Sequence, residues 1–305
     1  MLATRDTGLR LVVVLLGLVA LLGLLAPAAT GGRKQRWASK GHSDIPLQYF
    51  QGVTSSPQKQ LFFDGVFTGL YRTDFKLREQ AANFNVIPLN VTMTEGYDHI
   101  GDITWDAAEG GRVLLPLECV SLTGGNTCKT GSIGVADPVT LKWRYYVKLD
   151  PAFIDKAMWA EVSPDGQLLW TSSGSGNDLL AYRIADITPV NAAPAGPRLQ
   201  PVKVLRGAAP PSGITGATFY KARLLLAGQR IGPFQVWSID LPTGKRRLEI
   251  ERFYVGESEG LDVFRGLRGL LHWQITPFRT SGRPPTFGSG DSALVHFVRR
   301  TTKRR

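Results

Sequence analysis

The sequence predicts an all-β fold, a single β-propeller of five blades, preceded by a hydrophobic N-terminal helix. Short apolar runs recur along the chain, turn-forming residues separate them, and similar groups of runs repeat at near-regular spacing. With 305 residues, of which 43% are hydrophobic, the chain is large enough for one all-β domain with a full core. The predicted boundaries are an export segment over 1–29, a basic flexible stalk over 30–42, the propeller over 43–298 and a basic tail over 299–305.

The N-terminus carries an export signal. Arg5 and Arg10 precede an unbroken apolar run over 11–26, and Pro27 and two alanines follow it, as at a signal-peptidase site. The run is long for a cleaved signal and short for a membrane span, which needs about 20 residues. A cleaved signal peptide and a membrane anchor over 11–29 therefore both stay open. Either one predicts a secreted or extracytoplasmic domain.

The net charge of +11 lies mainly in the two tails. Residues 30–42 contain four basic residues and no acidic one, and residues 299–305 contain five basic residues, so the body over 43–298 is nearly neutral. A nucleic-acid-binding domain normally carries a basic face on its folded body. The distribution therefore argues against nucleic acid as a partner. It predicts solvated tails that can contact an anionic membrane surface.

The two cysteines of the chain, Cys119 and Cys128, flank a turn-rich loop of eight residues. No second cysteine pair and no nearby histidine supplies the further ligands that a zinc site needs. A structural disulfide is therefore predicted. It fits an oxidising compartment outside the cytosol.

The clearest repeat unit runs from Met158 to Ile184. It reads as a short strand, a tight turn, a second strand and, after a glycine-rich loop, a third strand. The residues that carry this pattern are Ser163, Pro164, Asp165, Gly166, Trp170, Thr171 and Tyr182. The unit resembles the YVTN-type propeller repeat. The resemblance covers this unit alone and implies propeller architecture.

Fainter units of the same kind lie on both sides of it. When the first strands of the units are aligned, five residues occupy equivalent positions: Gly52, Asp102, Glu161, Gly216 and Gly260. Successive members are 50, 59, 55 and 44 residues apart. The last unit lacks an outer strand, which the segment 45–50 is predicted to supply, so that two sheet edges are hidden. Six blades are the alternative if 76–94 or 189–207 contains another unit. A two-sheet sandwich is the alternative fold.

Polar side chains near the start of each first strand are expected to converge on the propeller axis. The predicted channel-lining, ligand-binding residues are Gln51, Asp98, His99, Asp102, Glu161, Thr215, Glu257 and Glu259. Several carboxylates and one imidazole around the axis of a nearly neutral domain form an uneven distribution. They predict either a ligand site or a wet channel in which the same groups bind water.

Calcium is the cofactor that such a channel suggests, because it prefers oxygen ligands and carboxylates from different blades supply them. Its predicted ligands are Asp102, Glu161 and Glu259. The arrangement resembles, in architecture only, propeller lactonases of the gluconolactonase and paraoxonase kind. That resemblance implies a metal-activated water and a catalytic base, His99. The chain departs from those families in having no asparagine at the aligned first-strand positions.

The sequence contains no nucleophile elbow, no phosphate-binding loop and no zinc-protease motif. It therefore predicts an exported binding module at the cell surface or in the extracellular space. The predicted partner is a protein, a glycan or a small molecule. A metal-dependent hydrolase of lactones or esters is the alternative.

Overall fold

The structure, a computed structural model, describes residues 36–65, 68–119, 128–173, 176–211, 213–229, 233–279 and 292–300. The predicted export segment and the last five residues of the basic tail lie outside these ranges. None of the helices within them is long and apolar enough to cross a membrane.

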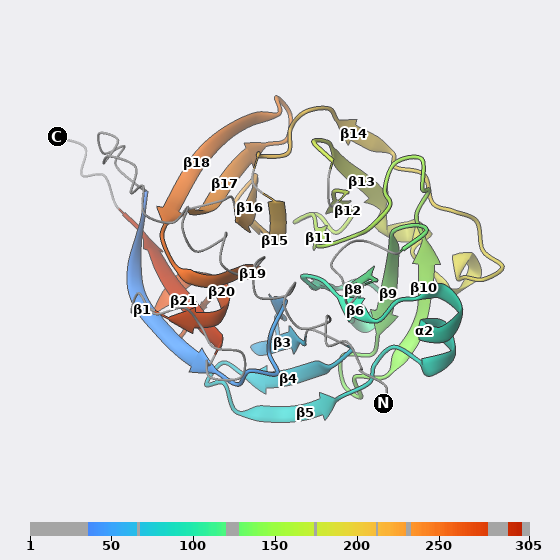
Figure 1. Cartoon of the computed structure of the whole chain (residues 1–305), viewed down its shortest axis with the longest axis horizontal. Helices are drawn as coiled ribbons and strands as arrows, with labels where there is room; N and C mark the ends of the chain where they lie inside the picture. Colours follow the sequence, from blue (N-terminus) through green and yellow to red (C-terminus); the bar gives the residue numbers. More distant parts are fainter. Residues whose placement is uncertain are drawn as a thin grey trace, which may run out of the picture. The chain divides into compact units, whose positions relative to one another are not determined.

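Five antiparallel sheets surround one axis and form a five-bladed propeller (Figure 1). Blade 1 consists of β2 (Val53–Ser55), β3 (Gln60–Asp64), β4 (Leu70–Asp74) and β5 (Glu79–Asn83). Blade 2 consists of β6 (His99–Ile100), β7 (Thr104–Asp106), β8 (Arg112–Glu118), β9 (Ser132–Ala136) and β10 (Trp143–Lys148). Blade 3 consists of β11 (Glu161–Val162), β12 (Leu168–Thr171), β13 (Leu179–Arg183) and β14 (Lys203–Leu205). Blade 4 consists of β15 (Gly213–Tyr220), β16 (Arg223–Gln229), β17 (Phe234–Asp240) and β18 (Lys245–Arg252). Blade 5 consists of β19 (Val255–Gly266), β20 (Gly269–Arg279), β21 (Ser292–Arg299) and β1 (Trp37–Ile45).

The predicted five blades are confirmed, and the six-bladed and sandwich alternatives are wrong. The two segments considered for a sixth blade contain instead the outer strands of blades 1 and 3, together with short helices. Segment 76–94 contains β5 and most of α2 (Leu89–Glu95), and segment 189–207 contains η4 (Pro189–Asn191) and β14. The two remaining short helices are η2 (Ala108–Gly110) and η3 (Ile184–Asp186).

Blade 5 is closed by a strand from the N-terminal side, as predicted, but the strand is not the predicted one. β1 pairs with β21 from Trp37↔Arg299 to Ile45↔Ser292, so the closing strand ends where the predicted segment 45–50 begins. Pro46 explains the difference, since proline has no N–H to donate to the ladder. The predicted stalk 30–42 therefore overlaps β1, and Arg299 of the predicted tail belongs to β21.

Apolar side chains fill the spaces between neighbouring blades. Phe62 of blade 1 stacks on Trp105 of blade 2, with ring centroids 5.7 Å apart. Between blades 3 and 4, Trp159 and Ala217 belong to one buried cluster. Strands such as β8, all of whose residues are buried, contact apolar neighbours on both faces. This burial on both faces is why these strands read as continuous apolar runs.

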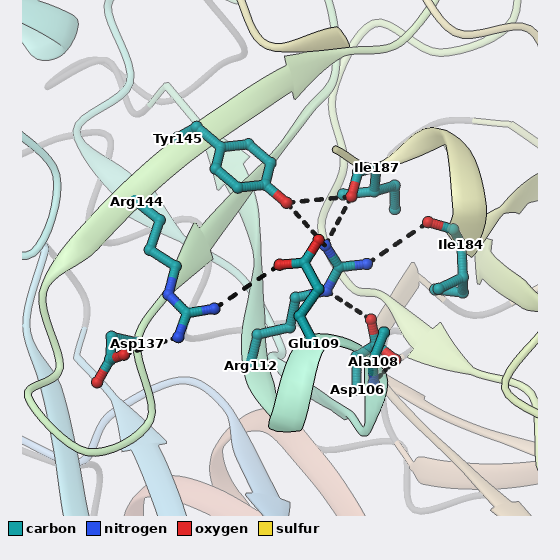
Figure 2. Close-up of polar contacts among 9 residues, drawn as sticks. All are labelled: Asp106, Ala108, Glu109, Arg112, Asp137, Arg144, Tyr145, Ile184 and Ile187. Carbon is teal, nitrogen blue, oxygen red and sulfur yellow. Dashed lines mark hydrogen bonds and ion pairs between the residues drawn. The ribbon is translucent and has the colours of Figure 1, made fainter. Parts of the chain in front are cut away.

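A buried arginine joins blade 2 to blade 3 (Figure 2). The Arg112 guanidinium pairs with Asp106 Oδ2 (2.6 Å) and donates to the Tyr145 hydroxyl (2.7 Å). It also donates to the carbonyl oxygens of Ile187 (2.6 Å) and Ile184 (3.5 Å), which belong to blade 3. Only 2% of the side chain is exposed. All of these partners are needed, because an unpaired charge at this depth is costly.

The predicted disulfide is confirmed. Cys119 follows β8, Cys128 precedes β9, and the two sulfur atoms are bonded. The loop that the bond closes, 120–127, is outside the described residues.

Candidate functional site

The side chain of Asp102 occupies the propeller axis. Its Oδ1 accepts a hydrogen bond from Val53 N of blade 1 (3.1 Å). Its Oδ2 accepts hydrogen bonds from Ala217 N of blade 4 (2.8 Å) and Leu261 N of blade 5 (3.4 Å). Its backbone pairs in parallel with Trp159 of blade 3. Asp102 is 1% exposed and connects its own blade 2 to the other four, to three through its carboxylate and to blade 3 through its backbone.

Glycines allow the inner strands to approach this carboxylate. A Cβ atom at Gly52 or Gly260 would come within 3 Å of Asp102 atoms, and one at Gly216 would collide with the backbone of blade 5. The predicted register is therefore right in placing these glycines beside Asp102. It is wrong by two residues in blade 3, where Trp159 and not Glu161 pairs with Asp102.

Where the inner strands end, beyond Asp102, the surface forms a depression with a volume of about 650 Å³. We call it the strand-end depression. We call the residues level with Asp102 the axial layer; they are Gly52, Asp102, Trp159, Gly216 and Gly260. Each of the five blades contributes to the depression the residue that lies two positions after its member of the axial layer. These five lining residues are Thr54, Thr104, Glu161, Thr218 and Asp262. Trp105 and Phe219 are also among the lining residues, and the backbone N–H of each donates to a side chain of the depression, Thr54 and Glu161 respectively. A concave site with an apolar wall and a few convergent polar groups is typical of ligand binding.

Two carboxyl groups from different blades line the depression. Glu161 Oε1 accepts a hydrogen bond from Phe219 N (3.0 Å), and its Oε2 accepts one from the Thr104 hydroxyl (2.8 Å). Asp262 is 8% exposed, and its Oδ1 accepts a hydrogen bond from Val263 N (2.7 Å). Asp262 Oδ2 is buried and accepts no well-formed hydrogen bond from the described residues.

Burial changes the protonation of both groups. It raises the pKa of Glu161 to about 8, and the nearby Asp262 contributes to that rise. It raises the pKa of Asp262 to about 6, although the neighbouring Ser55 and Thr218 hydroxyls act in the opposite direction. At neutral pH, Glu161 is therefore mostly protonated and Asp262 mostly ionised.

Six of the predicted site residues lie on the opposite side of Asp102, where the inner strands begin. These residues, the strand-start group, are Gln51, Asp98, His99, Thr215, Glu257 and Glu259. The Gln51 amide nitrogen donates to His99 Nε2 (2.8 Å), so this ring nitrogen is an acceptor already in use. Burial, with the charge of Lys156, lowers the pKa of His99 to about 4. His99 is thus a weaker base than the predicted catalytic role requires.

Two acidic members of the strand-start group, Glu257 and Glu259, are close enough to interact. Burial and the adjacent Glu257 carboxylate raise the pKa of Glu259 well above its ordinary value. Glu118, which sequence analysis did not select, forms an ion pair with Lys156 (2.8 Å). The structure thus brings Gln51 to His99 and Glu257 to Glu259, and it separates Glu161 from all of them.

The predicted calcium ligands are not assembled into one site. Asp102 uses both oxygens on backbone N–H groups, Glu161 lines the strand-end depression, and Glu259 lies on the other side of the axis. Among the residues that the structure describes, no group of three or more His, Cys, Asp or Glu side chains could hold a metal ion. The residues present do not fit the predicted ion, so no chemical step is derived through it.

Sequence analysis missed Asp262 and the three threonines of the strand-end depression. A signal for them was present, since Thr54, Thr104 and Thr218 occupy equivalent positions in three repeats, two residues after Gly52, Asp102 and Gly216. Side chains alternate along a strand, so positions two apart point the same way. The prediction followed only the residues at and before the axial layer, which lie on the other side of the propeller.

No protein-family model matches the chain, and no curated protein matches it in sequence. Several solved structures are similar in fold. A luciferin-regenerating enzyme is 10% identical, with a TM-score of 0.50 over 85% of this chain and 95% of that one. The PQQ-bound aldose sugar dehydrogenase of Streptomyces coelicolor is 12% identical, with a TM-score of 0.43 over 87% and 99%. The calcium-binding protein regucalcin of Agrobacterium tumefaciens is 11% identical, with a TM-score of 0.44 over 84% and 93%. At these identities the similarity concerns the fold alone.

Proposed function

We propose that this protein is an exported binding module that holds a small polar ligand in the strand-end depression. The observation that carries the proposal is the convergence of all five blades on one concave site that contains the carboxyl groups of Glu161, which is half-buried, and Asp262, which is buried. The volume of about 650 Å³ lies within the usual range for small-molecule pockets. Asp102 and its backbone partners form a rigid floor beneath the site, which limits the entropy lost on binding.

Export is supported by two independent features. The apolar segment over 11–26 follows two arginines, and the disulfide between Cys119 and Cys128 forms in oxidising compartments. We propose a location outside the cytosol on this basis. The alternative, a metal-dependent hydrolase, lacks an assembled ligand set among the described residues.

A bulky side chain at the rim of the depression tests the site even before the ligand is identified. Ala107 lines the depression and is exposed, so Ala107→Trp should obstruct it without disturbing the core. Ala152, an exposed residue that is not among the lining residues, gives the matched control Ala152→Trp. We expect a ligand-detected NMR screen of sugars, amino acids, amines and organic acids to find binders of the wild-type protein. Their binding should be lost in Ala107→Trp and kept in Ala152→Trp.

Two outcomes would contradict the proposal. Binders that are retained equally by Ala107→Trp would place the ligand elsewhere on the molecule. A screen with no compound sensitive to Ala107→Trp would remove the functional role of the depression. A circular-dichroism melt of both variants verifies that each is folded.

A further inference from the structure

The carboxyl groups of the strand-end depression have no cation to neutralise them within the described part of the chain. Neither Glu161 nor Asp262 forms an ion pair there. The charged residues on the lining are these two acids, Asp165 in the turn after β11 and Lys221 in the turn after β15. The Lys221 ammonium group lies over the Tyr220 ring, 5.6 Å from its centroid. The lining therefore carries three acidic groups and one basic group, and the lysine forms no ion pair with Glu161 or Asp262.

The hydroxyl groups on the lining leave few donors for a ligand. Thr54 Oγ1 accepts a hydrogen bond from Trp105 N (3.0 Å). Thr104 Oγ1 donates to Glu161 and accepts from Val162 N (3.3 Å). Two buried side-chain atoms of the lining residues form no well-formed hydrogen bond with the described residues: Asp262 Oδ2, an acceptor, and Trp105 Nε1, a donor. With three carboxyl groups on the lining, acceptors still outnumber donors. An acceptor-rich site selects a ligand with several N–H donors. A sugar, whose hydroxyls need donors as well as acceptors, is less suited to it.

We propose that the strand-end depression binds an ammonium or guanidinium group between Glu161 and Asp262. This inference rests on the proposed function and names its ligand class. The bound cation supplies the positive charge that both carboxyl groups lack, in charge-assisted hydrogen bonds. The nitrogen group belongs either to a free amine or to a basic side chain of a peptide.

Binding is coupled to the release of a proton. Before binding, the Glu161 carboxyl group holds a proton at neutral pH because burial raises its pKa to about 8. A cation beside it favours the carboxylate, so the proton leaves to the buffer while the ligand keeps its own charge. Affinity should therefore rise with pH from 6 to 8, as both acids ionise. Hydrogen bonds from the Ser163 hydroxyl and from Gln167 N lower the pKa of Asp165, another carboxyl group on the lining, so it stays ionised over this range.

Calorimetric titration of the full folded domain with butylamine and with acetyl-Gly-Lys-Gly-amide tests the proposal. Their matched neutral analogues are 1-butanol and the same peptide with norleucine in place of lysine. Titration at pH 7 in two buffers of different ionisation enthalpy counts the protons released. We expect the cationic probes to bind at least about tenfold more tightly than the neutral ones, with close to one proton released. A preference for the peptide or for butylamine distinguishes the two sources of the cation.

Three variants connect the result to the named residues. Glu161→Gln keeps the shape, and its amide can still accept from Phe219 N and donate to Thr104. Both Glu161→Gln and Asp262→Asn should weaken the cationic probes by at least about tenfold. Asp44→Asn removes a charge that is 75% exposed on the outer strand β1 and should leave binding unchanged.

Neutral probes that bind as well as the cationic ones, or cation binding without proton release, would overturn the ligand class. The proposed function would survive that result if Ala107→Trp still abolished the neutral binding. Equal weakening by Asp44→Asn would show that only long-range charge attracts the probes, and it would also overturn the inference.

Discussion

Asp102→Asn is expected to lower the free energy of unfolding by about 3–5 kcal/mol, among the largest effects of any single substitution in this chain. The carboxylate accepts hydrogen bonds from backbone N–H groups of three blades. An asparagine keeps one oxygen but turns an NH2 group toward N–H donors. Those buried donors then have no acceptor, which costs more than the hydrogen bonds themselves contribute. Urea unfolding followed by tryptophan fluorescence measures the change.

A second buried aspartate provides the control. Asp64 is fully buried, and neither of its carboxyl oxygens accepts a well-formed hydrogen bond from the described residues, although the Gly52 backbone N–H lies close enough to lower its pKa. Burial and the nearby Asp102 raise the pKa of Asp64 well above its ordinary value. Asp64→Asn removes a titratable group that forms no well-formed hydrogen bond with the described residues, so it should be close to neutral or stabilising. Equal destabilisation by the two substitutions would show that Asp102 has no special role at the axis.

Arg112→Met is expected to cost about 3–5 kcal/mol, because it leaves the Asp106 carboxylate buried without its partner. The substitution also removes donors from the Ile184 and Ile187 carbonyl oxygens, so blades 2 and 3 lose a direct connection. Asp106 Oδ1 keeps its hydrogen bond from Ala108 N (3.0 Å), which cannot compensate for the lost ion pair. Equilibrium unfolding in urea gives the magnitude.

A double-mutant cycle separates the ion pair from the other contacts of Arg112. Asp106→Leu together with Arg112→Met removes both charges. This double variant should be more stable than the sum of the single effects predicts. Additive effects would mean that the pair does not interact, in conflict with the 2.6 Å separation between Arg112 Nε and Asp106 Oδ2.

The propeller was predictable because each blade repeats a pattern that the backbone requires. Gly52, Gly216 and Gly260 recur where the inner strands converge, and a side chain there would collide with Asp102 or, at Gly216, with the backbone of blade 5. The closing strand was harder to place. β1 carries its apolar anchor, Trp37, at the far end from the predicted segment, and most of its intervening residues are exposed. A strand that borders solvent has little hydrophobic pattern by which to recognise it.

The candidate site was predictable only in part. Glu161 was selected from the sequence and does line the depression, but it was grouped with residues from the other side of the axis. The position of a residue along its inner strand decides on which side of Asp102 its side chain lies. The register error of two residues in blade 3 placed Glu161 level with Asp102, and its position in the depression was therefore missed. The role of Asp102 was also not predictable. From the sequence, a carboxylate on the axis suggests a metal ligand, and only the structure shows that backbone N–H groups of other blades donate to it.

The central claim is that burial shifts the pKa values of Glu161 and Asp262, which have no ion-pair partner among the described residues. Carbon-13 NMR of the side-chain carboxyl groups, assigned with Glu161→Gln and Asp262→Asn, follows the two titrations directly. The account predicts that Glu161 titrates near pH 8 and Asp262 near pH 6. Titration of both groups at the ordinary values of 4.5 and 3.8 would mean that water already solvates them, and it would contradict the account.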